Sequence, residues 1–205
     1  MDRSAILRLL QDVCVMSNNF PAQYKIDGIQ LRQRDRMTAG KGALTPHGTH
    51  NGYPVVVQEI VARSGVSRRE IYSQLVIQWQ ADHPNLLRVK GVFMDGNTPL
   101  IVLPYLPGGN PMQILRDARD PQKLLFMFRG VISGVKHLHH HQRPPIIHGN
   151  IHTDNLVLDE SGNVVLGQFS LSRVKYPKGP TRTTRRLGNN LHYIAPELYP
   201  DDDLL

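Results

Sequence analysis

The sequence contains little cysteine and no long apolar run. Its single cysteine, Cys14, cannot form an internal disulfide, which fits a reducing compartment. A membrane-spanning helix needs about 20 apolar residues, whereas the run from Leu100 to Leu103 stops at Pro104. The amino terminus does not read as a secretory signal, because Arg8 interrupts its apolar stretch. These absences predict an intracellular, cytoplasmic protein without a membrane partner.

Acidic residues are missing from a long stretch near the carboxy terminus. No Asp or Glu lies between Ser161 and Pro196, although the chain has 17 of them. The same stretch holds the basic residues Arg173, Lys175, Lys178, Arg182, Arg185 and Arg186. A basic segment can hold phosphate or nucleic acid, but no series of aromatic side chains alternates with these cations to stack bases. We predict a solvated loop, and nucleic acid is not an expected partner despite the basic segment 173–186.

The residues that are present predict a mixed α and β domain of ordinary globular composition. Residues 1–15 are predicted to form a helix, because apolar side chains recur at helical spacing at Ile6, Leu9, Leu10 and Val13. Short β-runs follow at 28–31 and 55–60. A capping box from Ser67 to Glu70 predicts the start of a helix that ends near Gln80.

The clearest helical pattern opens at Pro121. Five apolar residues at alternating spacings of four and three predict one core-facing stripe, made of Leu124, Phe128, Val131, Val135 and Leu138. The stripe ends in a histidine cluster at 137–141. Clustered histidines can bind metal, but neighbours two residues apart do not share a helix face. No metal site is expected there.

The central stretch of the chain runs from Ile146 to Leu158 and contains His148-Gly149-Asn150-Ile151-His152-Thr153-Asp154-Asn155. Gln168-Phe169-Ser170 follows a second apolar run, and Ala195-Pro196-Glu197 comes later. Their order and spacing resemble the protein-kinase set H-R-D-x-x-x-x-N, D-F-G and A-P-E. His148, Asn155, Phe169, Ala195, Pro196 and Glu197 match that set and are expected to be structural. Asn150 and Gln168 stand where the two catalytic aspartates are expected.

Upstream residues extend the resemblance. Gly40 and Gly42 occupy a glycine-rich turn, although Thr45-Pro46 interrupts it and favours a loose surface turn. Gln58 stands at the lysine of the V-A-I-K pattern, and Gln74 at its glutamate partner. Leu103 and Tyr105 fall at the gatekeeper and hinge. The segment 71–93 and the hinge resemble tyrosine-kinase-like protein kinases of mushroom-forming fungi.

The resemblance implies a two-lobed α+β fold with a β-rich amino-terminal lobe that carries one main helix. We expect an N-terminal helical extension at 1–27, a kinase-like N-lobe and hinge at 28–106, and a partial kinase-like C-lobe at 107–205. The helical lobe is expected to be truncated, because eight residues follow Glu197.

The substitutions imply a catalytically impaired domain, a pseudokinase that acts as a binding or regulatory scaffold for a protein partner. None of the positions Gln58, Asn150 and Gln168 can carry charge, so no cofactor is expected. Gly40, Gly42, Gln58, Leu103, Tyr105 and Asn155 form a vestigial nucleotide cleft, and Asn155 with Gln168 a vestigial metal site.

Two alternatives remain open at this stage. The first is a weakly active or nucleotide-binding kinase that takes ATP and Mg²⁺ and uses displaced acids such as Glu70, Asp154 or Asp159. The second is a non-functional truncated gene product. In either case Tyr176, Thr181, Thr183 and Thr184 lie within the basic segment as possible phosphorylation sites.

Overall fold

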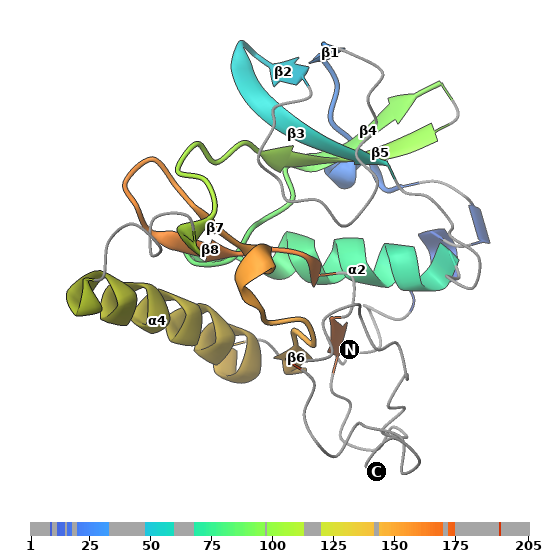
Figure 1. Ribbon diagram of the computed structural model, residues 1–205. Coiled ribbons are helices and arrows are strands. Elements are labelled where there is room, and N and C mark those ends of the chain that lie inside the picture. The colour runs from blue at the N-terminus through green and yellow to red at the C-terminus, as the bar shows by residue number, and fades with distance from the viewer. Residues whose placement is uncertain are drawn as a thin grey trace, which may run out of the picture.

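The computed structural model describes residues 9, 12–14, 16–17, 20–32, 48–59, 68–96, 98–112, 120–141, 144–169, 172–174 and 193. A five-stranded antiparallel sheet forms its upper part, with α2 beneath it, and α4 lies below a small hairpin (Figure 1). This arrangement confirms the predicted α+β fold with a β-rich part that carries one main helix.

The sheet has the order β1-β2-β3-β5-β4, built from β1 (Ile29–Leu31), β2 (Gly48–His50), β3 (Tyr53–Glu59), β4 (Gly91–Asp95) and β5 (Thr98–Pro104). The predicted β-runs at 28–31 and 55–60 correspond to β1 and β3. The β2–β3 hairpin turns at Asn51 and Gly52, whose φ angles of 51° and 81° define a left-handed two-residue turn. Asn-Gly is a strong hairpin signal, and the sequence reading missed it.

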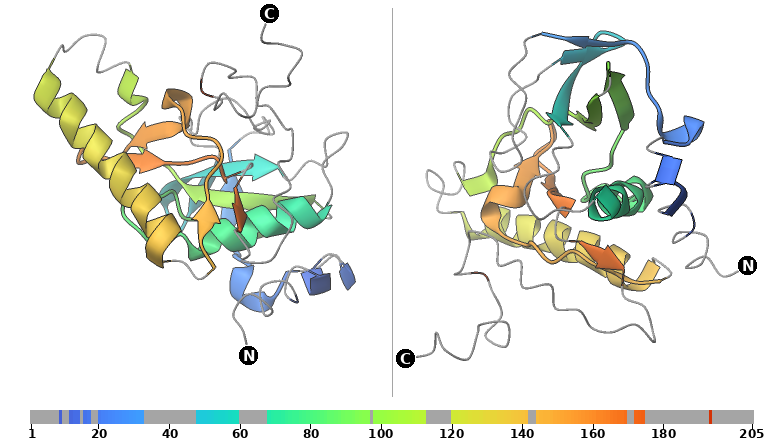
Figure 2. Two further views of the ribbon diagram at one scale, coloured as in Figure 1. Left: turned by 90° about the horizontal axis from the view of Figure 1, so that it is seen from below. Right: turned by 90° about the vertical axis from the view of Figure 1, so that its right-hand side faces the viewer.

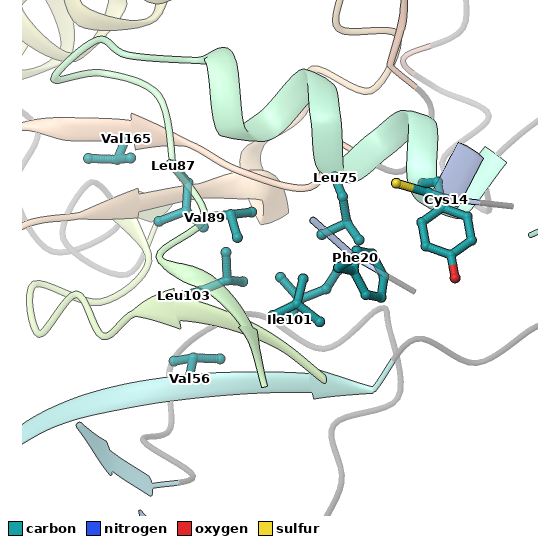
Figure 3. Packing of buried hydrophobic residues seen from close by; sticks show 11 residues of the cluster. Cys14, Phe20, Val56, Leu75, Leu87, Val89, Ile101, Leu103 and Val165 are labelled. Carbon is teal, nitrogen blue, oxygen red and sulfur yellow. The ribbon is translucent and has the colours of Figure 1, made fainter. Parts of the chain in front are cut away.

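Helix α2 (Arg68–Gln80) is buried on two sides, which explains why apolar residues surround so much of it. Tyr72 and Leu75 pack toward the sheet in a cluster that includes Val56, Ile101 and Leu103 (Figure 3). Ile77 faces a second cluster beneath the helix. Figure 2 shows α2 end-on between the sheet and α4.

Helix α4 (Pro121–Lys136) begins at Asp120, whose side chain accepts hydrogen bonds from the backbone N–H groups of Gln122 and Lys123. It continues into a π-helical turn, η2 (His137–His141). Among the described residues, no three His, Cys, Asp or Glu side chains are arranged as metal ligands, at this histidine cluster or elsewhere.

The predicted stripe of α4 was wrong at its start. Leu124 and Phe128 are 41% and 57% exposed, whereas Met127 is 8% exposed and packs with Leu158 and Val164. The reason is close backbone approach. A Cβ atom at Gly130 would lie 2.5 Å from Val164 Cγ1, and one at Gly134 would lie 2.9 Å from Leu86 Cδ2. The two glycines and Met127 therefore define the buried face.

Short pairs of strands organise the loops that follow α4. Strands β7 (Leu156–Leu158) and β8 (Val164–Leu166) form a hairpin, and β6 (Ile146–Ile147) pairs with β9 (Arg173–Val174). Residues 85–87 run beside β8, where Leu87 N–H donates to Leu166 O and Leu166 N–H to Asn85 O, both at 2.9 Å. The pairing of Leu156 with Leu166 in the β7–β8 hairpin places the loops after β6 and β8 next to each other.

None of the helices that the structure describes is both long and apolar enough to cross a bilayer.

Candidate active-site cleft

The loop after β6 is organised around His148, whose side chain is 1% exposed. Its Nε2 atom lies 2.9 Å from Gly167 O, and the backbone N–H of Asn150 donates to its Nδ1 atom at 3.3 Å. Burial lowers the pKa of His148 to about 4, against the opposing effect of the Gly167 carbonyl. The ring is therefore neutral at physiological pH, with its proton on Nε2, and it ties the two loops together.

Phe169, in the loop after β8, also connects the two loops. It is fully buried and packs edge-on against His148, with ring centroids 4.8 Å apart and planes at 68°. The same cluster includes Ile77 of α2 and Leu138 of η2. Both His148 and Phe169 thus lie in the core.

Asn155, at the end of η3 (Thr153–Asn155), holds the loop after β6 closed. Its side-chain amide donates to Asn150 O and to His152 Nε2, both at 2.8 Å. Its backbone carbonyl accepts from Gly167 N–H at 2.8 Å. With 6% exposure and both amide hydrogens engaged, Asn155 serves the loop's own structure.

His152 is the functional-site residue that sequence reasoning left undeveloped, although it stands where the kinase pattern has a lysine. It is 9% exposed and accepts the Asn155 amide hydrogen. Burial lowers the pKa of His152, and the Asp154 carboxylate, 3.8 Å from Nδ1, opposes that effect. Its acceptor role at Nε2 matches a neutral ring, which cannot replace the positive charge of lysine. No local sequence signal predicts this bond.

Gln58 lies on the α2-facing side of the sheet. Strand residues alternate between faces, so Gln58 shares its face with Val56, which packs in the α2-facing cluster. Its cross-strand partner is Ile101, and Val56 pairs with the buried Leu103. Gln74 lies in α2, but its side chain and that of Glu70 fall outside the described part of the chain.

The hinge follows β5 and connects to the β7–β8 hairpin. Tyr105 and Leu106 are half-buried against the α2-facing cluster. Gly108 N–H donates to Leu158 O, and a Cβ atom at Gly108 would meet Asp159 O at 2.4 Å, so only glycine fits. The side chain of Asn110 accepts a hydrogen bond from Met112 N–H at 2.8 Å.

Gln168 directly precedes Phe169 and is half-buried. Its φ of 58° lies in the left-handed region, which Asn and Asp tolerate better than Gln. The backbone thus keeps a conformation that suits a short polar side chain. The kinase resemblance predicts charged side chains at Gln58, Asn150 and Gln168, and all three residues carry neutral amides.

Asp154 and Asp159, two of the acids that a weakly active kinase could use, differ in how firmly their carboxylates are held. Asp159 is engaged by the β7–β8 turn, where its carboxylate accepts from Ser161 N–H, Asn163 N–H and the Asn163 side chain. The side chain of Asp154 is 73% exposed and faces His152.

Several predicted site residues lie outside the described residues. They are Gly40, Gly42, Tyr176, Thr181, Thr183, Thr184, Ala195, Pro196 and Glu197. The neighbouring Tyr193 is described, and its hydroxyl lies 3.4 Å from Thr153 Oγ1.

Comparison with known families agrees with this architecture. The sequence profile of the protein tyrosine and serine/threonine kinase family matches residues 36–204. The chain therefore belongs to the protein kinase family, as its motifs predicted.

Similar proteins come from Arabidopsis thaliana. A "probably inactive" leucine-rich repeat receptor-like protein kinase is 33% identical over 159 residues, which cover 72% of this chain and 15% of the relative. A G-type lectin S-receptor-like serine/threonine-protein kinase is 26% identical, over 77% of this chain and 20% of the relative. The chain thus spans about a fifth or less of these relatives. The resemblance to fungal families stays a prediction.

Proposed function

We propose that this chain is a catalytically impaired, tyrosine-kinase-like protein kinase domain, a pseudokinase that acts in signalling by binding a protein partner. The observation that carries the proposal is the set of neutral amides at Gln58, Asn150 and Gln168. The framework around these positions is built as a packed core, so the charge loss is not accompanied by loss of the fold.

Each substitution removes a different part of phosphoryl transfer, which depends on positioning and on electrostatic stabilisation of charged phosphates. Unit charges 4 Å apart near a protein surface attract by about 4 kcal/mol, whereas a neutral hydrogen bond contributes about 1 kcal/mol. Gln58 therefore cannot replace a lysine on the phosphates. Asn150 has no useful proton affinity and cannot serve as a general base. Gln168 offers Mg²⁺ an amide oxygen in place of a carboxylate.

The rival proposal is a weakly active kinase that binds ATP with Mg²⁺ and uses a displaced acid. Asp159 is a poor choice, because three hydrogen bonds to the hairpin turn occupy its carboxylate. Asp154 is exposed and would have to turn from His152. The relative whose name questions its activity adds weight to the pseudokinase proposal.

The other expectations follow from this proposal. No cofactor is expected. The side of the cleft that contains Gln58, Leu103, Tyr105 and Asn155 is a vestige of a nucleotide site. The free thiol of Cys14 supports an intracellular, cytoplasmic location.

Radiolabelled phosphate transfer tests the proposal. The chain is incubated with Mg²⁺ and terminally labelled ATP, together with an array of Ser, Thr and Tyr peptides, beside an Asp154→Ala variant. We expect no incorporation above a heat-denatured control in either protein. Transfer by the wild-type chain that disappears in Asp154→Ala would establish the rival enzyme.

A further inference from the structure

Helix α4 has a second apolar face beside its buried one, and this face is exposed. Four large side chains on it are 41–62% exposed: Leu124, Leu125, Phe128 and Ile132. Leu124, Phe128 and Ile132 are spaced four residues apart, which places them on one side of a helix with 3.6 residues per turn. Leu125 precedes Phe128 by three residues and shares that side. We call these four residues the outer face of α4. It extends over about 12 Å of the helix.

The two borders of the outer face differ. Val131 and Val135 lie along one border, where they are half-buried against the clusters that hold α4 to the rest of the domain. Arg129 and Lys136 lie along the other border and are exposed. Helix α4 itself forms the lower outer edge of the described elements, beneath the β7–β8 hairpin (Figure 1). The outer face is therefore an apolar surface between the body of the domain and two positive charges.

The two cations have no acidic counterpart on their own helix. Residues 121–141 contain no Asp or Glu, and neither cation forms an ion pair with an acidic side chain that the structure describes. Lys136 lies in the last turn, where the helix dipole favours a cation, but Arg129 lies in the middle of α4. The two are seven residues apart, so they lie on the same side of the helix, separated by about 10.5 Å along its axis. This pattern favours a partner with negative charge.

A second copy of this chain fits the outer face poorly. A two-fold dimer brings the same patch of both copies together, so Arg129 and Lys136 would meet an α4 that has no acid to pair with them. A bilayer surface also fits poorly. A helix that lies in such a surface carries cations around its polar face, whereas one border of this face is the domain itself.

We propose that the outer face of α4 is the docking site for an acidic amphipathic helix of a partner protein. The apolar side of that helix covers the four residues, and its acidic side chains, seven residues apart along one border, pair with Arg129 and Lys136. An apolar centre with a charged rim is the usual anatomy of a protein interface. The docking site rests on the binding function proposed above and contains none of the cleft residues. One helix face is a small interface, so we expect micromolar affinity for a single helix.

Fluorescence anisotropy with two synthetic peptides tests this docking site. Both are labelled amphipathic helices of about 20 residues with the same leucine face. One carries glutamates along the border of that face, and the other carries lysines. We expect the chain to bind the glutamate peptide about tenfold or more tightly than the lysine peptide, and added salt to weaken that binding. No nucleotide is present, so a negative result here leaves the labelled-phosphate experiment unaffected.

Two phenylalanines of α4 provide a matched pair of variants. Phe128 belongs to the outer face and is 57% exposed, whereas Phe126 is 55% exposed and lies roughly 160° around the helix from it. Serine and phenylalanine have similar helix propensity, so both variants should keep the stability of the wild type. We expect Phe128→Ser to weaken binding of the glutamate peptide by about tenfold, and Phe126→Ser to change it by less than about twofold.

Reversing the charges tests the acidic partner separately from the apolar contact. Arg129→Glu combined with Lys136→Glu leaves the four apolar residues in place. We expect this double variant to reverse the preference, so that the lysine peptide binds more tightly than the glutamate peptide.

Four results would overturn the proposal. The first is equal binding of the two peptides, or no binding of the glutamate peptide at high micromolar concentration. The second is a dimer in sedimentation velocity that Phe128→Ser dissociates, which would assign the outer face to a second copy. The third is binding to phosphatidylserine-containing vesicles that Phe128→Ser abolishes and Phe126→Ser does not. The last is a clear loss of stability in Phe128→Ser alone, which would mean that a segment of this chain already covers the face.

Discussion

The buried imidazole of His148 makes the stability of this domain depend on pH in a specific window. Its pKa in the folded chain is about 4, against 6.5 for the ordinary side chain, with burial as the largest cause. Because the unfolded chain binds the proton more readily, acid favours unfolding. The stabilising effect is complete above pH 6.5 and is lost as the pH falls toward 4. At about 1.4 kcal/mol for each pKa unit, the loss is roughly 3 kcal/mol.

A comparison with His148→Gln isolates this contribution. The free energy of unfolding is measured from urea titrations at several pH values between 7 and 4 for both proteins. His148→Gln should be the less stable at pH 7, because it loses the contacts to Gly167 and Asn150. The gap should then narrow by roughly 3 kcal/mol on acidification, since only the wild type takes up this proton on unfolding. His140→Gln removes an exposed imidazole as a control. A gap that stays constant or widens with acid would refute the reasoning.

Two further predictions concern packing and backbone conformation. Met127→Ala should lower the free energy of unfolding by about 2–3 kcal/mol, and Phe126→Ala, on the same helix but 55% exposed, by under about 1 kcal/mol; equal losses in urea unfolding would contradict the buried face of α4. At position 168, the free energy of unfolding from urea titrations should be higher for Gln168→Asn than for the wild type, and higher for the wild type than for Gln168→Val. Each step should be roughly 0.5–1 kcal/mol, because a β-branched residue is strained at a φ of 58°. The reverse order would show that side-chain contacts outweigh backbone strain at this position.

Sequence reasoning predicted the elements whose pattern is local. The valines of β3 read as a buried strand, and Pro121 marked the start of α4. The face of α4 could not be assigned in the same way, because residues 124–128 are all apolar and several stripes fit them. Gly130 and Gly134 decide the face through contacts with residues distant in sequence.

In the candidate site, too, some features follow from the local sequence and others depend on contacts made in the folded chain. The residue types at Gln58, Asn150 and Gln168 follow from motif spacing. The bonds that organise the loops, from Asn155 to His152 and from His148 to Gly167, join residues whose relation depends on the folded backbone. Motif spacing also gave no sign that His152 would be buried, because a histidine within a polar turn is usually exposed.

A folded kinase cleft without charged groups should not hold Mg·ATP, and isothermal titration calorimetry measures this binding. The wild-type chain is titrated with millimolar ATP, with Mg²⁺ and with a chelator, beside Gln58→Lys combined with Gln168→Asp. Restoring two charges should strengthen Mg·ATP binding by about tenfold or more. We expect the wild-type heats to match those of dilution under both conditions. Micromolar, Mg²⁺-dependent binding by the wild-type chain would contradict it.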